Sequence, residues 1–349
     1  MDAKMTNKRI SISFLFLVMV GFLTACNEEK PIAPRQNPST SGDQDTSGSS
    51  SDSSNAYPMR SEQLYFGEGF SQQLWYDLAS QTVVAQCHQR DWDLAFDCRP
   101  GVNRVYLNTG RVMQAAITGE ASLEDAATPP SSAYRPDHHG GDPDSLALGA
   151  RIPEDSVCWI DLGYDVDGRT LGKRKLRFEV RSDAYVVEFA FPDGSRRTVD
   201  TIRRNPDYTM MTYSLQDRQA RQVAPPKDAY DLWFTAYTHI FYAPGFTPYR
   251  VSGVLLNNHQ TRAYMDTSVA DFKAVEAADF QDDRPGEARD AIGYDWKSYN
   301  LQEGVYTVYP QQVYFIENNA GHRYALRFEA FYNAEGQRGY PEFAFRRLE

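Results

Sequence analysis

The sequence predicts an all-β protein, mainly antiparallel and folded as two packed sheets, with one short helix. Aromatic residues make up 13% of the 349 residues, and the 22 tyrosines and 19 phenylalanines among them favour strands over helices. Short apolar runs recur along the chain and are separated by turn signals rich in Gly, Pro, Asn and Asp. Together these features favour many short strands joined by tight turns.

The most apolar part of the chain is residues 230–257. Its first run, 230–242 (YDLWFTAYTHIFY), is apolar or aromatic at both even and odd positions. A strand with one exposed face would alternate apolar with polar residues, so this run is predicted to be buried on both faces. Pro244 and Gly245 break the run, and residues 249–256 (YRVSGVLL) are predicted to pair back as an antiparallel neighbour.

The remaining strands and one helix follow from the same patterns. The helix is predicted over residues 268–280 (SVADFKAVEAADF), because Val269, Phe272 and Val275 recur at helical spacing after the capping residue Thr267 or Ser268. Residues 122–144 are predicted to form a long polar surface loop. Further strands are expected within residues 61–80, 82–85, 90–96, 105–107, 114–117, 157–162, 175–180, 184–191, 197–202, 208–214, 303–310, 312–317, 322–332 and 339–345.

A short internal similarity suggests two related lobes. Residues 91–96 (DWDLAF) and 229–234 (AYDLWF) share the order aromatic, Asp, Leu, any residue, Phe. The match is short enough to arise by chance, but it suggests that the folded body, residues 61–349, divides into lobes 61–225 and 226–349.

The N-terminal segment is an export signal. Lys4, Lys8 and Arg9 precede an apolar stretch, residues 12–22, that is too short to remain as a membrane span. The following Leu-Thr-Ala-Cys resembles the bacterial lipobox, in which the cysteine, here Cys26, is acylated. The alternative is a chance cysteine after an ordinary signal peptide. Residues 1–25 are therefore expected to be removed, and the lipid on Cys26 should anchor the protein at the outer membrane and the cell surface.

Residues 26–60 are expected to be a disordered tether, since they are rich in Pro, Ser, Gly, Asp and Gln and contain little to bury. The net charge of −11 argues against nucleic acid as a partner.

Three cysteines remain after Cys26, namely Cys87, Cys98 and Cys158. Cys87 and Cys98 flank a predicted strand and could form a disulfide in an oxidising compartment. No CxxC motif occurs, so the sequence indicates neither a zinc knuckle nor a redox dithiol.

Six short motifs follow one another along the chain: residues 92–96 (WDLAF), 108–110 (NTG), 237–239 (YTH), 324–328 (YALRF), 331–333 (FYN) and 339–341 (GYP). In this order they resemble the HmuY family, haem-binding lipoproteins of Bacteroidetes outer membranes. The resemblance covers roughly residues 91–345 and the lipobox. It implies an all-β fold, surface exposure, haem as cofactor, and delivery of haem to an outer-membrane receptor. The two histidines that hold haem iron in the founding member do not carry over, and the region similar to its second ligand loop contains Tyr299 but no histidine.

His239 is the leading candidate for an iron donor, because it lies in an aromatic strand and haem sites combine a His, Met or Tyr donor with an apolar pocket. The alternative is a core histidine that is hydrogen-bonded within the fold. Tyr299 and Met265 are further possible donors, whereas His259 and His322 follow turn signals and are expected to be exposed.

Two other groups of residues could either bind a metal ion or form an ordinary loop or turn. His138 and His139 lie among Asp137, Asp142 and Asp144, a set that could bind a divalent cation or form a solvated polar loop. Residues 165–168 (DVDG) imitate the start of a calcium loop but lack the later ligands, so they are predicted to be a hairpin turn.

No catalytic motif is present: the sequence contains no GxSxG, HExxH or phosphate-binding glycine loop. The chain is therefore not expected to be an enzyme. Beside haem binding, the alternative function is a structural or adhesive surface lipoprotein that binds a protein or glycan without a cofactor.

Overall fold

The computed structural model describes residues 57–243 and 245–349. In these ranges the chain forms 20 strands and six short 3-10 turns, and every strand pair is antiparallel. The predicted all-β class is therefore confirmed. The signal peptide, Cys26 and the tether up to residue 56 lie outside the described residues.

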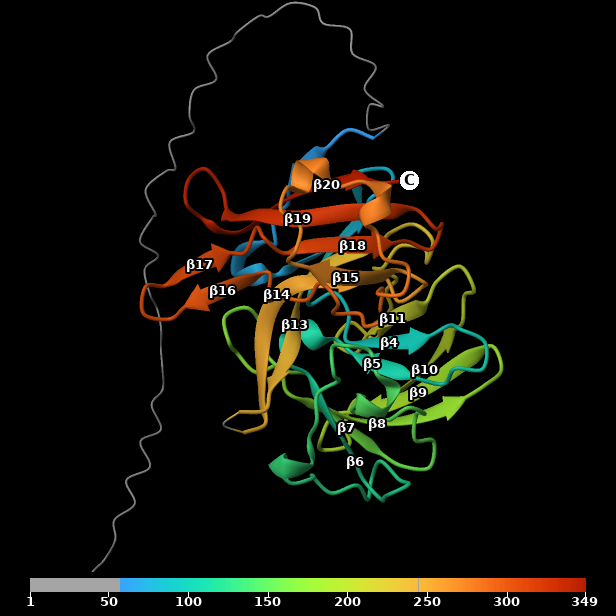
Figure 1. Ribbon diagram of the computed structural model, residues 1–349. Helices are drawn as coiled ribbons and strands as arrows, with labels where there is room; N and C mark the ends of the chain where they lie inside the picture. Colours follow the sequence, from blue (N-terminus) through green and yellow to red (C-terminus); the bar gives the residue numbers. More distant parts are fainter. Residues whose placement is uncertain (1–56, 244) are drawn as a thin grey trace, which may run out of the picture.

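The strands form two lobes of two sheets each, and the four sheets are stacked as layers (Figure 1). The terminal lobe contains both ends of the described chain, and the inserted lobe is formed by the continuous stretch β4 to β12. The outer sheet of the terminal lobe has the order β1 (Arg60–Gln63), β20 (Arg338–Arg347), β19 (Arg323–Tyr332), β18 (Val313–Glu317) and β15 (Arg262–Asp266). Its inner sheet has the order β14 (Thr247–Leu256), β13 (Leu232–Phe241), β2 (Gln72–Asp77) and β3 (Thr82–His88).

The inserted lobe has the same two-sheet arrangement. Its inner sheet has the order β12 (Gln219–Ala220), β11 (Met210–Ser214), β4 (Leu94–Asp97) and β5 (Val105–Leu107). Its outer sheet has the order β10 (Thr198–Arg203), β9 (Ala184–Ala190), β8 (Lys173–Val180), β7 (Cys158–Asp161) and β6 (Gln114–Ile117). A separate ribbon of β16 (Lys297–Asn300) and β17 (Val305–Val308) projects from the terminal lobe.

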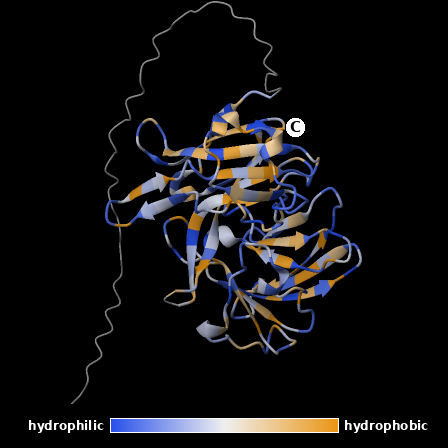
Figure 2. Ribbon diagram, in the orientation of Figure 1, coloured by the Kyte–Doolittle hydropathy of each residue, from blue (hydrophilic) through white to orange (hydrophobic). Residues whose placement is uncertain are grey.

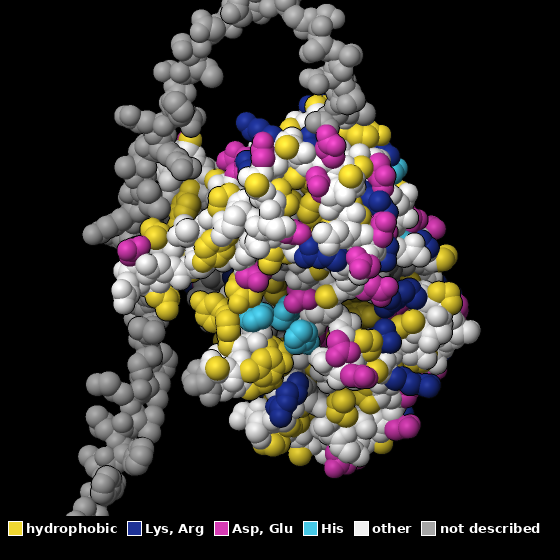
Figure 3. Space-filling view, in the orientation of Figure 1, with side chains coloured by type: hydrophobic (Ala, Val, Ile, Leu, Met, Phe, Trp, Pro, Cys, Tyr) yellow, Lys and Arg dark blue, Asp and Glu magenta, His cyan; other side chains and the backbone are white. Residues whose placement is uncertain are grey.

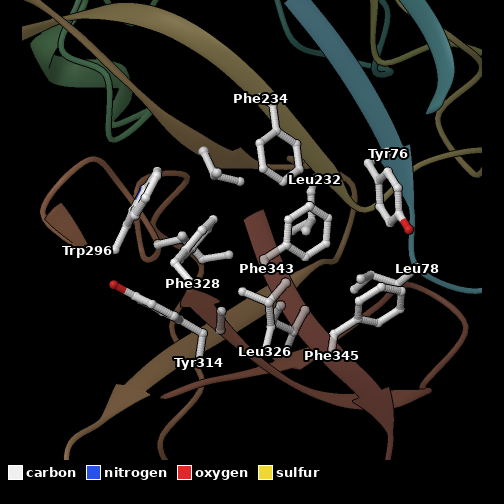
Figure 4. Packing of buried hydrophobic residues seen from close by; sticks show 14 of the residues in the cluster. Tyr76, Leu78, Leu232, Phe234, Trp296, Tyr314, Leu326, Phe328, Phe343 and Phe345 are labelled. Carbon is white, nitrogen blue, oxygen red and sulfur yellow. The ribbon is translucent and has the colours of Figure 1, made fainter. Parts of the chain in front are cut away.

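Three apolar layers separate the four sheets, and hydrophobic residues recur along the strands that face them (Figure 2). The layer inside the terminal lobe includes Phe234 of β13 and Phe343 of β20, whose rings stack at 5.2 Å (Figure 4). The layer between the two inner sheets includes Trp233 of β13, which stacks on Trp75 of β2 at 5.5 Å. Adjacent residues of β13 thus enter different layers, which confirms that this strand is buried on both faces.

The two lobes repeat one strand order. The two outer sheets correspond strand by strand. The order β6-β7-β8-β9-β10 in the inserted lobe is equivalent to β15-β18-β19-β20-β1 in the terminal lobe. The inner sheets, read β5-β4-β11-β12 and β14-β13-β2-β3, correspond in the same way. The boundary predicted between residues 225 and 226 lies between β12 and β13. However, β1 pairs with β20, β2 pairs with β13, and β3 extends the same sheet from β2, so the terminal lobe combines both ends of the chain.

Polar side chains also repeat between the lobes, at the positions of the sequence similarity. The side chain of Asn108 donates hydrogen bonds to two backbone carbonyls, including that of Trp92, at 2.6 and 2.9 Å. In the terminal lobe, Asn257 donates to two carbonyls, including that of Tyr230, at 2.7 Å each. Both asparagines are fully buried. The short sequence match therefore reflects a shared structural role.

The aspartates of the repeated motif are equivalent as well. The carboxylate of Asp93 accepts the backbone N–H of Leu215 at 2.6 Å, and that of Asp231 accepts the N–H of Leu78 at 2.9 Å. Each aspartate thereby fixes the end of a neighbouring strand, β11 in one lobe and β2 in the other.

The helix predicted over residues 268–280 is wrong. The segment forms two separate 3-10 turns, Phe272–Ala274 and Ala277–Asp279. The carboxylate of Asp271 accepts the backbone N–H of Lys273, and Glu276 has an extended backbone between the turns. Such local side-chain to backbone bonds compete with helical ones, while Phe272 and Val275 still pack on the outer sheet. In the described ranges, no helix is sufficiently long or apolar to traverse a bilayer.

The disulfide suggested between Cys87 and Cys98 is not formed, since both thiols are free and buried. Cys87 lies on β3 of the terminal lobe, where its thiol donates to the amide oxygen of Gln73 at 3.5 Å. Cys98 follows β4 of the inserted lobe, and its thiol donates to the carbonyl of Phe96 at 3.7 Å. The sequence places the two cysteines close together, but the chain between them crosses from one lobe to the other.

We expect Asn108→Ala and Asn257→Ala to destabilise the protein to a similar extent, by about 1–3 kcal/mol, because each leaves two buried carbonyls without a donor. Urea unfolding measures the loss, and Asn319→Ala, which removes an exposed hydrogen bond to Asp228, is the matched control. A loss confined to one of the two buried asparagines would contradict their equivalence.

Candidate functional site

The largest cavity of the site region lies beside β14, between that strand and the β16–β17 ribbon. Its volume is about 830 Å³, within the usual range for small-molecule sites. We call it the tyrosine groove. It is lined by Phe70, Phe241, Tyr249, Arg250, Val251, Ser252, Tyr294, Asp295, Lys297, Ser298, Tyr299, Leu301, Tyr306, Tyr309 and Arg338.

Aromatic side chains from three elements form the walls of the tyrosine groove. Tyr299 and Tyr306 face each other across the β16–β17 ribbon, with ring centroids 4.6 Å apart. Tyr249 of β14 contacts Phe241 of β13 at 6.1 Å. Burial raises the pKa of Tyr306 to about 12, whereas Tyr299 is 37% exposed. The groove therefore combines aromatic ring surfaces with phenol groups.

Two cations of the groove are held by neutral oxygens. The Nζ of Lys297 donates to the carbonyl of Ser252 at 2.6 Å, and the guanidinium of Arg250 donates to three backbone carbonyls and to Gln89. Burial lowers the pKa of Lys297 to about 7, although the nearby Asp295 opposes this, and burial lowers the pKa of Arg250 to about 10. Since its partners carry no net charge, the guanidinium of Arg250 can attract an anionic group of a ligand.

A second group of polar side chains lies next to the tyrosine groove. We call it the histidine cluster: His138, His139, His239 and Asp290. His139 Nε2 lies 2.9 Å from Asp290 Oδ2 and 3.2 Å from His239 Nδ1. The ring of His138 stacks on that of His139 at 4.3 Å. Figure 3 shows histidine side chains gathered beside hydrophobic ones near the middle of this face of the molecule.

His239 is adjacent to the groove but does not line it. Its ring contacts Phe241 at 4.7 Å and Tyr294 at 4.8 Å, and both of these rings do line the groove. Burial and the neighbouring His139 lower the pKa of His239, which favours its neutral form. His239, the predicted iron donor, therefore lies behind the wall of the tyrosine groove, whereas Tyr299 lies on that wall.

The polar loop that contains His138 and His139 is more buried than the sequence predicts. Asp137 is 2% exposed, and its carboxylate accepts the backbone N–H groups of Leu107 and Ala147 at 2.7 and 2.8 Å. His139 is 4% exposed. Because each oxygen of the Asp137 carboxylate accepts a backbone N–H group, this side chain fixes the loop. In residues 57–243 and 245–349, no group of three or more His, Cys, Asp or Glu side chains is arranged to hold a metal ion.

The remaining candidate donors lie apart from the groove. His259 is in the turn after β14, where its Nε2 lies 3.2 Å from the carboxylate of Asp228. His322 is in the β18–β19 turn, and its backbone N–H donates to Asn318. Met265 is 38% exposed on β15.

Comparison with known proteins assigns the family. The family described as HmuY protein matches residues 70–345 of this chain. The chain belongs to the HmuY family. No curated protein matches the chain as a whole or in part.

Solved structures of HmuY-like proteins share low sequence identity with this family member. Apo PinO from Porphyromonas gingivitis is 9% identical, with a TM-score of 0.35, and the match covers 84% of this chain and 98% of PinO. The apo HmuY analog TFO from Tannerella forsythia is 7% identical, with a TM-score of 0.26 and coverage of 85% and 100%. A candidate HmuY-like heme-binding protein from Bacteroides vulgatus is 12% identical, with a TM-score of 0.22 and coverage of 84% and 93%.

Sequence reasoning located one wall of the groove in this HmuY-family protein and missed the rest. The stretch 296–300 (WKSYN) gave Tyr299, but Lys297 in the same stretch was not singled out. Asp290 and Tyr294 lie in a segment without strand or helix signals. Two adjacent histidines and a third on an aromatic strand were visible, yet nothing in the sequence indicated that they meet.

Lys297 should make the stability of the protein depend on pH. Its pKa is about 7 in the folded state, against 10.5 ordinarily, so between these values the unfolded chain binds a proton that the folded chain lacks. The contribution of Lys297 to the free energy of unfolding therefore rises with pH across this window. We expect the stability of the wild type, relative to Lys297→Met, to increase between about pH 7.5 and pH 9. Urea unfolding at both pH values measures it, with the exposed Lys273→Met as control. Parallel pH profiles for the wild type and Lys297→Met would refute this.

Proposed function

We propose that the protein binds haem in the tyrosine groove, with Tyr299 as the axial donor to iron. The observation that carries the proposal is an aromatic cavity of about 830 Å³ with the exposed residue Tyr299 on its wall. Tyrosine is an established axial ligand of haem iron, and membership of the HmuY family supports the same ligand class.

The residues present fit a haem group in three respects. The rings of Tyr249, Tyr299 and Tyr306 offer surfaces for stacking against a flat macrocycle. Arg250 offers positive charge for carboxylates, since its hydrogen-bond partners are neutral oxygens, and Lys297 offers N–H donors on the same wall. Bound haem would supply redox-active iron, and its capture serves iron acquisition rather than catalysis.

The cavity favours haem binding over the adhesive alternative. A cofactor-free adhesive protein requires an outer surface for its partner but no cavity with an iron donor on its wall. We further propose that the lipid on Cys26 anchors the protein at the outer membrane, where it would hand haem to an outer-membrane receptor. The lipobox-like sequence before Cys26 supports the anchor.

Addition of haem to the purified protein should produce a saturable Soret shift. We expect Tyr299→Phe to weaken haem binding by at least about tenfold, which corresponds to about 1.4 kcal/mol, because the ring remains and only the iron donor is lost. Tyr340→Phe is the control, since Tyr340 stacks on Tyr65 away from the groove.

Two outcomes would contradict the haem proposal. Absence of any shift at micromolar haem would discard haem as the ligand. Loss of the shift in His239→Ala, with the shift retained in Tyr299→Phe, would move the iron to the histidine cluster.

We expect Cys26→Ser to move the full-length protein from the detergent phase to the aqueous phase in a detergent partition of whole cells. The thiol is the only lipid acceptor that the lipobox resemblance provides, and a single uncleaved signal segment is too short to span a bilayer. A wild-type protein that already partitions into water would contradict the anchor.

A further inference from the structure

The histidine cluster joins three segments of the chain at the contact between the lobes. His138 and His139 belong to the loop that follows β6 in the inserted lobe. His239 lies on β13 of the terminal lobe, and Asp290 lies in the segment between β15 and β16. The segment that carries Asp290 continues directly into Tyr294, which lines the tyrosine groove. A change in the cluster therefore acts on the wall of the groove.

The contacts of His139 determine which nitrogen atoms of the cluster carry a hydrogen. Its Nε2 faces both Asp290 Oδ2, at 2.9 Å, and His239 Nδ1, at 3.2 Å. Burial opposes ionisation of the Asp290 carboxyl, but its hydrogen bond with His139 and the nearby His138 keep its pKa low. The carboxyl group is therefore ionised. Nε2 of His139 must then carry the hydrogen that this carboxylate accepts. Nδ1 of His239 then faces an N–H group and must present a lone pair. The arrangement holds only while this nitrogen is unprotonated.

Few other charged groups face the cluster and could balance a proton on His239. Asp142 acts on His138 from the same loop, and Tyr237 of β13 packs against the His139 ring at 5.2 Å. Tyr294 packs against His239 at 4.8 Å. Burial lowers the pKa values of both His138 and His239. Asp290 forms an ion pair with His139 and acts on His138 and His239 through its charge.

We propose that the histidine cluster is an acid-operated latch on the tyrosine groove. When Nδ1 of His239 binds a proton, two N–H groups oppose each other across 3.2 Å with no lone pair between them, and the His239–His139 contact breaks. Phe241 and Tyr294, which pack on the His239 ring, then lose their support. The wall of the groove opens in mild acid and closes again near neutral pH.

The direction of the pH effect follows from the linkage between proton binding and the two states of the groove. The closed state lowers the pKa of His239, so the open state binds a proton more readily. The closed state is therefore favoured fully above the ordinary histidine pKa of about 6.5 and loses that advantage as the pH falls below it. The latch rests on the proposed function only for the identity of the ligand, because opening can be measured without haem.

The test is hydrogen exchange of the haem-free protein, followed by mass spectrometry at about pH 7.5 and pH 5.5 and corrected for the intrinsic pH dependence of exchange. In the wild type, peptides covering residues 235–242 and 286–296 should exchange at least about threefold faster at the lower pH, because the open state binds a proton more readily than the closed state. Peptides of the inserted outer sheet, such as residues 184–190, should show no change.

Variants identify the group that titrates. His239→Asn keeps an oxygen that accepts from His139 but does not titrate, so the exchange of these peptides should become independent of pH. His259→Asn, in a distant turn beside Asp228, should behave as the wild type. Exchange in the wild type that is the same at both pH values overturns the latch, and so does a pH response that persists in His239→Asn.

Haem release provides a separate arm. If the groove binds haem, the dissociation rate should rise at the lower pH in the wild type and remain constant in His239→Asn. Failure of haem to bind would refute the proposed function and leave the exchange result to decide on the latch. The melting curve of His239→Asn at neutral pH, compared with that of the wild type, shows whether the variant is folded.

Discussion

β13 packs on both of its faces, and this burial joins the two lobes. Phe234 faces the core of the terminal lobe, while Trp233 faces the layer between the inner sheets, where it stacks on Trp75. Burial of a large aromatic side chain contributes on the order of 2–3 kcal/mol, and such residues follow one another along β13. A strand of this kind requires a sheet on each side, so the four-layer arrangement depends on it.

The two lobes share a strand order but differ where the candidate site lies. β4 and β5 contain four and three residues, whereas their equivalents β13 and β14 contain ten each. The additional length carries His239, Phe241 and Tyr249 beyond the shared core. These residues support or form the wall of the tyrosine groove and meet the loop of the inserted lobe. The site therefore results from an extension of one lobe, while the repeated core maintains the fold.

Neutral backbone groups hold several buried ionisable side chains of this protein. Arg250 is bound by backbone carbonyls, and Asp137 by backbone N–H groups. Such dipoles satisfy hydrogen bonding without cancelling the charge. At Arg250 this leaves a local positive charge beside the groove in a chain whose net charge is −11. The histidine cluster is the contrasting case, because its side chains contact one another and the carboxylate of Asp290.

The sequence by itself determined the elements whose signals are local. The distribution of apolar residues along a strand does not depend on distant parts of the chain, so the double-sided burial of β13, its hairpin with β14 and the all-β class could be predicted. The repeated WDLAF and YDLWF motifs indicated two lobes for the same reason. Short polar strands such as β12 and β16 gave no such signal and were missed.

Only the tertiary structure decided which distant residues meet. His139 and His239 are 100 residues apart, and their contact depends on how the loop of one lobe packs on a strand of the other. The pairing of β1 to β3 with the end of the chain, the free thiols of Cys87 and Cys98 and the groove beside β14 have the same origin. Residues 268–280 had helical spacing, but packing of Phe272 on the outer sheet and local aspartate bonds favoured separate turns. A periodic pattern specifies which face of an element is buried, and the topology of the whole chain specifies against what.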